Sequence, residues 1–279
     1  MTKPSPSNPT AKRRGRRASS SSTGSSPGRS PSRRDLTVPA VRIAIFDLDD
    51  TLYDCLGQRV RVAHRNAARE LVRAGVPAST EAVLRVRMQA LERDPRLEPI
   101  DREVCRRFGV RFTQRLHQLS RRAYFTTPVG RLRLFPGARQ LLRRIHGKGV
   151  RVFVVSYGNP ATQRAKVRAL GLDGEPAVDR ILYADTGKVT TKEALFRRIL
   201  RRYGGDAGSF LVVGDRPTSE IRAGKRLGMR TVRIRRGEFS RLQAATPEEK
   251  ADFEVQDIRQ LLALPLHFGQ RKTTSGKAH

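Results

Sequence analysis

An apolar run that ends abruptly in acidic residues is the feature that most constrains how this chain can fold. Residues 43–46 read Ile-Ala-Ile-Phe, and the positions after them include Asp47, Asp49, Asp50 and Thr51. A buried strand accepts charge only at its end, so these carboxylates are expected at the carboxyl edge of a sheet, where open α/β folds place their sites. Asp47 and Asp49 lie two positions apart and leave the strand on one side. Paired carboxylates repel each other unless a cation holds them, so this edge is predicted to bind a hard metal ion such as Mg²⁺.

The remainder of the chain predicts a doubly wound, parallel α/β sheet with a block of helices inserted after its first strand. Apolar residues recur at helical spacing from 59 to 125, and no strand pattern interrupts this block. Beyond it, helices alternate with apolar runs that are expected to be strands, at 150–155, 180–183, 209–213, 229–234 and near 253–255. Strands that alternate with helices form parallel βαβ units, which build a Rossmann-like sheet covered on both faces.

These patterns divide the chain into a core, an insert and two tails. We expect an α/β core at residues 39–54 and 132–265, a helical insert at 55–131, a disordered tail rich in Ser, Pro and Arg at 1–38 and a polar tail at 266–279. Residues 1–38 hold almost no apolar side chains, so burial cannot offset the entropy of ordering them. A chain of 279 residues is long enough for one full domain and a smaller second one.

The chain is strongly basic, with a formal net charge of +31. Residues 1–38 contain nine lysines and arginines against Asp35 alone, so they carry +8 and the rest of the chain carries +23. One interpretation is attraction to nucleic acid or another polyanion through the release of counterions. The other is an arginine-rich surface with no specific partner, because no recognised nucleic-acid-binding motif accompanies the charge. Both interpretations stay open at this point.

The sequence shows no signal for a membrane or for secretion. No run approaches the roughly 20 apolar residues that span a bilayer, and no apolar stretch follows the basic N-terminus as in a secretory signal. Residues 1–38 have the Arg-rich, acid-poor composition of an organellar transit peptide but lack its amphipathic helical pattern. Cys55 and Cys105 are too few and too far apart for a disulfide framework or a zinc site. We therefore expect a cytoplasmic protein with two unpaired thiols.

Polar residues follow three of the expected strands, and two lysines lie near the start of an expected helix. They are Asp47, Asp49 and Thr51, then Ser156, then Lys188 and Lys192, and finally Asp215 and Glu220. With these residues in this order, the chain resembles the haloacid-dehalogenase-like (HAD) hydrolase superfamily, and specifically those members whose helical cap is inserted after the first motif. The resemblance spans residues 42–264, nearly the whole chain outside its tails.

The resemblance implies a Mg²⁺-dependent phosphatase that hydrolyses a small phosphorylated metabolite through an aspartyl-phosphate intermediate. Asp47 would be the nucleophile, and Asp49 would protonate the leaving oxygen and then deprotonate the attacking water. Thr51, Ser156 and one lysine would contact the phosphate oxygens. The ligands of the metal would be Asp47, the backbone carbonyl of Asp49, and Asp215, with Glu220 as a further candidate.

Three positions depart from the pattern of the superfamily. Tyr157 stands where many relatives have an asparagine, and Asn159 could take over the hydrogen bonds of that asparagine. The active-site lysine usually precedes a proline, which is missing here; Lys192, at the start of a helix, is the first choice and Lys188 the second. Glu220 stands where a second aspartate is common, and its carboxylate can still bind a metal directly or through water.

Several of the motif residues also have an ordinary structural explanation. Thr51 and Ser156 could cap the helices that follow them, and Asp50 is expected to be only a turn residue. Among enzymes of this superfamily, a dehalogenase is less favoured than a phosphatase, because it needs neither a metal nor the acid that Asp49 supplies. A protein that binds nucleic acid or another polyanion and carries a HAD-like core is the alternative of a different class.

The sequence leaves the identity of the substrate open. The cap of such enzymes closes over the site and supplies selectivity. Candidates for that role, which could equally be solvated surface residues, are Arg59, His64, Arg102 and Tyr124. Phosphoglycolate, nucleoside monophosphates and sugar phosphates all remain candidate substrates, and the oligomeric state is not predicted.

Overall fold

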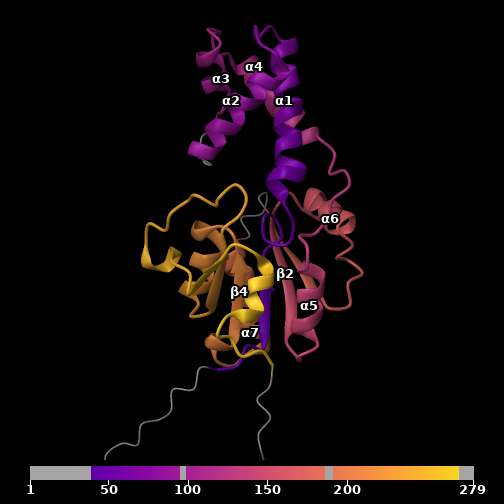
Figure 1. Cartoon of the computed structure of the whole chain (residues 1–279), viewed down its shortest axis with the longest axis vertical. Coiled ribbons are helices and arrows are strands. Elements are labelled where there is room, and N and C mark those ends of the chain that lie inside the picture. The colour runs from indigo at the N-terminus through magenta and orange to yellow at the C-terminus, as the bar shows by residue number, and fades with distance from the viewer. Residues whose placement is uncertain (1–38, 95–98, 186–190, 270–279) are drawn as a thin grey trace, which may run out of the picture. The chain divides into compact units, whose positions relative to one another are not determined.

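Parallel strands form a six-stranded sheet in the part of the chain that the structure describes. The computed structural model describes residues 39–94, 99–185 and 191–269. The order of the strands along the sheet is β3-β2-β1-β4-β5-β6. Figure 1 labels β2 and β4 of this sheet. Their bounds are β1 (Ile43–Phe46), β2 (Arg151–Gly158), β3 (Arg180–Asp185), β4 (Phe210–Gly214), β5 (Arg230–Ile234) and β6 (Phe253–Val255). β1 therefore lies between β2 and β4, and Phe46 is in register with Val154 and Val213.

Helices cover both faces of the sheet. They are α5 (Ala138–His146), α6 (Pro160–Ala169), α7 (Lys192–Tyr203) and the short α8 (Arg222–Arg226). Successive residues of β1 point to opposite faces: Ala44 and Phe46 belong to one apolar cluster, and Ile43 and Ile45 belong to another. The first cluster takes in side chains of α5 and α6, and the second takes in side chains of α7 and α8. The doubly wound, parallel sheet predicted from the sequence is therefore confirmed.

Helices also fill the segment between β1 and the rest of the sheet. They are η1 (Leu56–Val60, a π-helical turn), α1 (Arg61–Arg73), α2 (Thr80–Arg93), α3 (Asp101–Arg107) and α4 (Gln114–Thr126). Helices α1 to α4 pack around an apolar cluster of their own, which includes Leu71, Val83 and Val104. Ser79 caps α2 by accepting a hydrogen bond from the backbone N–H of Ala82 at 3.2 Å. Throughout the described residues, no helix is long and apolar enough to cross a membrane.

The C-terminal segment stays ordered beyond the boundary predicted from the sequence. Leu266 is buried, and the backbone of Val41 donates to the carbonyl of His267 at 2.6 Å and accepts from the N–H of Gly269 at 2.9 Å. Residues 266–269, which the sequence placed in a polar tail, therefore pair with the chain just before β1. Residues 1–38 and 270–279, where tails were predicted, lie outside the described residues. The predicted limits of the core and of the insert as separate domains stay predictions.

Arg139 and Arg143 of α5 form ion pairs with Glu175, which lies in the loop between α6 and β3. The contribution of these ion pairs to the free energy of unfolding can be tested. The carboxylate of Glu175 is 1% exposed and accepts hydrogen bonds from Arg139 Nη1 at 2.5 Å and Arg143 Nε at 2.9 Å. The hydrogen bond from Arg143, helped by Arg139 and opposed by burial, lowers the pKa of Glu175 from 4.5 to about 2. The ionised carboxylate therefore stabilises the fold above pH 4.5, and this contribution is lost as the pH falls from 4.5 toward 2.

A Glu175→Gln variant is expected to lower the free energy of unfolding at pH 7 by about 1–3 kcal/mol. The difference from the wild type should shrink as the pH falls from 4.5 toward 2, because over this range the carboxyl binds a proton more readily in the unfolded chain than in the folded one. Urea unfolding at several pH values measures both effects. Glu81, whose side chain is 63% exposed in its pair with Arg65, is the matched control, and Glu81→Gln should cost less than about 0.5 kcal/mol. A pH-independent difference for Glu175→Gln would contradict the prediction.

Candidate active site

The carboxyl ends of three adjacent strands bring the predicted site residues together. Asp47 follows β1, Ser156 lies near the end of β2, and Asp215 follows β4. Lys192 is the first residue of α7, and Glu220 lies in the π-helical turn η3 (Pro217–Ile221) that follows β4. All five side chains are buried. The order of the strands explains this convergence, because β2 and β4 flank β1 and all three run in one direction.

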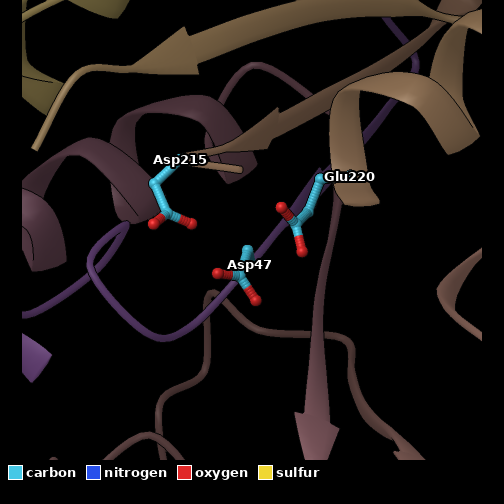
Figure 2. Close-up of side chains that lie close together, drawn as sticks. All are labelled: Asp47, Asp215 and Glu220. Carbon is cyan, nitrogen blue, oxygen red and sulfur yellow. The ribbon is translucent and has the colours of Figure 1, made fainter. Parts of the chain in front are cut away.

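Asp47, Asp215 and Glu220 form an acid cluster, in which one oxygen from each carboxylate lies within 4.8 Å of the others (Figure 2). Burial is the main cause that raises the pKa of Asp47 to about 7 and the pKa of Asp215 well above its usual value, and the neighbouring carboxylates add to it. Lys192 Nζ contacts Asp47 Oδ1 at 2.5 Å and also contacts Glu220 Oε1. Three ionised carboxylates beside one ammonium would carry a net charge of −2. The oxygen donors and this charge fit a divalent cation.

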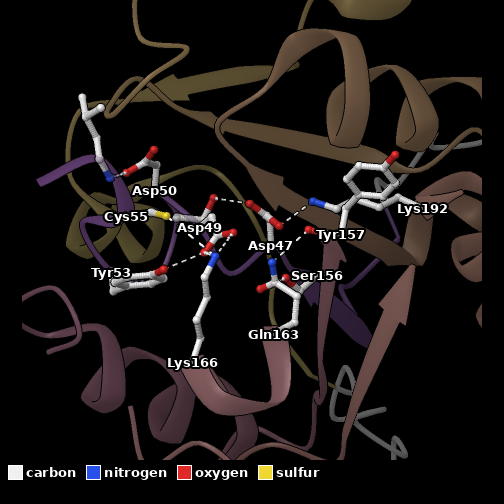
Figure 3. A network of polar contacts seen from close by, with 12 residues as sticks. Asp47, Asp49, Asp50, Tyr53, Cys55, Ser156, Tyr157, Gln163, Lys166 and Lys192 are labelled. Carbon is white, nitrogen blue, oxygen red and sulfur yellow. Dashed lines mark hydrogen bonds and ion pairs between the residues drawn. The ribbon is translucent and has the colours of Figure 1, made fainter. Parts of the chain in front are cut away.

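Asp49 lies outside the acid cluster and has different partners. Lys166 Nζ, on α6, donates to both carboxylate oxygens of Asp49, at 2.7 and 2.9 Å, and the hydroxyl of Tyr53 donates to Oδ1 at 2.8 Å (Figure 3). Burial acts to raise the pKa of Asp49, but the charge and hydrogen bonds of Lys166 outweigh it and hold this pKa below its usual value. Neither Lys166 nor Tyr53 was identified from the sequence. The available signal for Lys166 was a charged residue on the face of a helix that packs against the sheet.

Thr51 and Ser156 do not cap helices. The hydroxyl of Thr51 donates to Asp47 Oδ2 at 3.4 Å. The hydroxyl of Ser156 donates to Gln163 Oε1 at 2.9 Å (Figure 3). The cap of α6 is instead Asn159, whose side chain accepts hydrogen bonds from the N–H groups of its first turn. The side chain of Asn159 therefore makes the contacts of a helix cap. Tyr157 is 49% exposed and lines the cavity at the site.

Asp50 lies in a turn, as the sequence predicted, but it is buried and has contacts beyond that turn. Its φ of 54° lies in the left-handed region, which aspartate tolerates better than most residues. Its carboxylate accepts hydrogen bonds from the N–H of Leu56 at 2.9 Å and of Glu238 at 3.3 Å, so it connects the end of β1 to the loop after β5. Burial raises the pKa of Asp50 to about 6. Of the two candidate lysines, Lys192 reaches the acid cluster, and Lys188 lies outside the described residues.

Two adjoining cavities lie at this edge of the sheet. One, of about 500 Å³, is lined by Asp47, Asp49, Lys166, Lys192 and Asp215 among others. The second, of about 490 Å³, lies against α1, α2 and α4 of the insert. The two cavities share four lining residues, which are Tyr124, Tyr157, Arg216 and Glu238. A molecule held at Asp47 could therefore extend into the space beneath the insert.

The second cavity is lined by a buried polar network of the insert. Arg87 contacts Asp101, donates from Nε to His64 Nδ1 at 3.1 Å and donates from Nη1 to Ser120 at 3.1 Å. His117 Nδ1 lies 2.8 Å from Asp101 Oδ2. Burial, with the nearby charge of Arg87, lowers the pKa of His64 to about 3, so this imidazole is neutral at pH 7. The network places several hydrogen-bonding side chains at the wall of the cavity.

Two of the four selectivity candidates predicted from the sequence line these cavities. His64 and Tyr124 do so. Arg59 is buried and donates from Nη2 to the carbonyl of Thr127 at 2.8 Å, and Arg102 lies over the ring of Phe112 at 4.3 Å. Neither arginine lines the two cavities. Arg87 and His117 were missed, because nothing in the helical pattern separates a buried polar residue from an exposed one.

The fold and the site together define a class of α/β enzymes, in which acids follow the two central strands and helices are inserted directly after the first strand. The model of one family, described as haloacid dehalogenase-like hydrolase, matches residues 41–228. The chain belongs to this family, which confirms the resemblance to the superfamily that was drawn from its sequence.

Known relatives extend over most of the chain. The chain is 27% identical to the glyceraldehyde 3-phosphate phosphatase of Pyrococcus furiosus, over 80% of this chain and 92% of the relative. It is 30% identical to the protein of the same name from Pyrococcus abyssi, over 71% and 82% of the two chains. A predicted phosphoglycolate phosphatase from Haemophilus somnus 129pt has a similar structure, with a TM-score of 0.59, 18% identity, and coverage of 80% of this chain and 97% of that one. This last likeness concerns the fold alone.

Proposed function

We propose that the protein is a Mg²⁺-dependent phosphatase that hydrolyses a small phosphate monoester through an aspartyl-phosphate intermediate. The observation that carries this proposal is the position of Asp47, at the end of β1 in the acid cluster and in contact with Lys192. Membership of the hydrolase family supports it. The names of the relatives, which are phosphatases of glyceraldehyde 3-phosphate, support a small phosphorylated substrate.

The residues of the acid cluster fit a bound Mg²⁺. Asp47, Asp215 and Glu220 offer buried carboxylate oxygens close to one another, and we assign the backbone carbonyl of Asp49 as a further ligand. Bound there, the ion would neutralise charge on the phosphoryl oxygens and help to orient the phosphoryl group. The raised pKa values of Asp47 and Asp215 support this fit, since they reflect carboxylates that burial and mutual repulsion leave poorly stabilised.

In the first half of the reaction, an oxygen of Asp47 attacks phosphorus and the bond from phosphorus to the leaving oxygen breaks. Asp49, in its protonated form, gives a proton to the leaving oxygen, so the organic part departs as an alcohol and Asp47 becomes a phosphoaspartate. Lys166 lowers the pKa of Asp49 and so favours its ionised form, which is the form needed in the second half of the reaction. Lys192 neutralises charge beside Asp47, and the buried hydroxyls of Thr51 and Ser156 are assigned to the phosphate oxygens.

In the second half, water attacks phosphorus and loses a proton to Asp49. The bond between phosphorus and the Asp47 oxygen breaks, which releases inorganic phosphate and restores the carboxylate. The organic part of the substrate is assigned to the cavity beneath the insert, with residues 55–131 acting as the cap. Its wall offers hydrogen-bonding side chains, among them His64 and Ser120, so we expect it to favour a hydroxylated leaving group.

The proposal is tested by measuring phosphate release from a panel of phosphate esters with Mg²⁺ present. The panel contains glyceraldehyde 3-phosphate, phosphoglycolate, nucleoside monophosphates and sugar phosphates. We expect a kcat/KM on the order of 10⁴ M⁻¹s⁻¹ or more for the best substrate. Release of halide from 2-haloacids without Mg²⁺, and no release of phosphate from any ester, would contradict the phosphatase and favour the dehalogenase.

The binding of nucleic acid or another polyanion remains a separate prediction, which is compatible with the phosphatase activity. The net charge of +31 favours it, and residues 1–38, which carry +8, lie outside the described residues. Salt-sensitive binding to nucleic acid that is lost when residues 1–38 are deleted would support it. Absence of binding at low salt would rule it out.

A further inference from the structure

Helix α6 presents two buried polar side chains to the site, three positions apart on one face of the helix. Gln163 accepts a hydrogen bond from the hydroxyl of Ser156 and donates to the carbonyl of Tyr157 at 3.1 Å. Lys166 reaches Asp49, which precedes it in the chain by 117 positions. The start of α6 directly after β2 brings this face of the helix to the carboxyl edge of the sheet.

A lysine at position 166 is energetically unfavourable if its purpose is only structural, because its ammonium group is buried. Its side chain is 7% exposed, and a buried ammonium is costly unless it is paired and hydrogen-bonded. The apolar contacts of α6 with the sheet are already made by Val167 and Leu170, which are buried in the core cluster on that face. The partner that compensates the charge of Lys166 is Asp49, together with a longer contact to Cys55 Sγ at 3.9 Å.

Asp47 and Asp49, the two acids just after β1, each contact a different lysine (Figure 3). Lys192 contacts Asp47, and Lys166 contacts both carboxylate oxygens of Asp49. With the hydroxyl of Tyr53 on Oδ1, the side chain of Asp49 is held by two residues from different elements. Three hydrogen bonds to one carboxylate leave it little rotational freedom.

We propose that Lys166 is a positioning residue for Asp49, which fixes the carboxyl group where it exchanges a proton first with the leaving oxygen and then with water. This inference rests on the proposed phosphatase activity. Without Lys166, Asp49 would lose two of the three contacts that hold its side chain, so the steps that need its proton would slow. Binding of the substrate would be little changed, because Lys166 has no assigned contact with the phosphate.

The test compares two leaving groups in a Lys166→Met variant. An alkyl alcohol leaves only with a proton from Asp49, whereas p-nitrophenolate leaves without one. With glyceraldehyde 3-phosphate, or the alkyl ester that the panel selects, we expect kcat to fall about 10²-fold with KM within about 3-fold of the wild type. With p-nitrophenyl phosphate, rapid-quench measurements should show the aspartyl-phosphate forming within about 5-fold of the wild-type rate and then accumulating, because its hydrolysis still needs Asp49.

Further variants separate positioning from a general loss of structure. Lys166→Arg should recover part of the lost kcat, because a guanidinium can also bind both oxygens of a carboxylate. Arg168→Met removes an exposed charge from the same helix and should leave both substrates unaffected. Melting curves establish that each variant is folded. In an Asp49→Asn background, Lys166→Met should have almost no additional effect, because the two residues act as a unit.

Equal losses with both leaving groups in the rate at which the aspartyl-phosphate forms, a loss confined to KM, or an additive effect of Lys166→Met on Asp49→Asn would overturn the inference. So would a Lys166→Met variant with wild-type rates. These outcomes differ from failure of the proposed function, in which the wild type itself releases no phosphate from any ester.

Discussion

Replacing Asp47 by asparagine is expected to reduce kcat/KM for the hydrolysis of phosphate esters by about 10⁴-fold or more. The amide cannot form the covalent phosphoryl intermediate. Among the described residues, no other carboxylate lies directly after β1 and also contacts Lys192, so none can replace Asp47 as the nucleophile. The fold should persist, because Asp47 is one of three buried acids that repel one another and Lys192 keeps its contact with Glu220. Phosphate release and a melting curve on the same preparation measure the two expectations.

An Asp54→Asn variant is the matched control for this change. Asp54 lies in the segment between β1 and η1, where its carboxylate accepts a hydrogen bond from the N–H of Gly57 at 2.7 Å, and it does not line the cavity at the acid cluster. We expect this control to keep its activity within about 3-fold, since it has no assigned role in the reaction. Wild-type rates in Asp47→Asn, with a melting temperature within about 5 °C of the wild type, would refute the assigned nucleophile.

The fold was predictable because its signals are local. An apolar run of strand length before the acids, and later runs separated by helical patterns, determine a parallel doubly wound sheet through rules on connection and chirality. The structure confirms this for all the described strands. The polar C-terminal tail was predicted to begin at residue 266, and no pattern in the sequence indicated the contacts that residues 266–269 make. Only the three-dimensional pairing of Val41 with residues 267–269 reveals that this segment is ordered.

The site was predictable where a rule ties chemistry to a strand end. Asp47, Ser156 and Asp215 each follow or end an apolar strand, and adjacent parallel strands must bring such residues together. Lys192 was chosen from the resemblance and from its place at the start of a helix, and its contact with Asp47 joins residues 145 positions apart. No spacing rule in the sequence specifies a contact of that kind.

The residues that were missed share a physical cause. Lys166 and Arg87 lie on helices whose spacing predicts a buried face, but a long cation near the edge of that face is usually solvated. What buries each of them is a carboxylate supplied by a different element, Asp49 for Lys166 and Asp101 for Arg87. Long-range pairing of this kind becomes visible only when the elements are packed.

Removal of divalent metal is expected to abolish phosphate release, and the acid cluster supplies a second measurement that does not depend on activity. Without a bound metal ion, the negative charge of the three buried carboxylates is compensated by Lys192. Within the described residues, Lys192 is the one cationic side chain found in an ion pair with them. Mg²⁺ should therefore bind the folded state selectively and raise the melting temperature of the wild type. At 100 times the dissociation constant, the expected gain is about 2.7 kcal/mol in the free energy of unfolding.

An Asp215→Asn variant separates this effect from general stabilisation by salt. The amide removes one charged ligand and one source of repulsion, so the metal-free variant should melt at or above the temperature of the metal-free wild type. Its gain in melting temperature with Mg²⁺ should be largely lost, together with its activity. Asp173→Asn, a change at an exposed carboxylate in the loop after α6, should keep the wild-type gain. Equal gains in the wild type and in Asp215→Asn would contradict the assignment of Asp215 as a ligand, because Mg²⁺ would then be acting elsewhere on the chain.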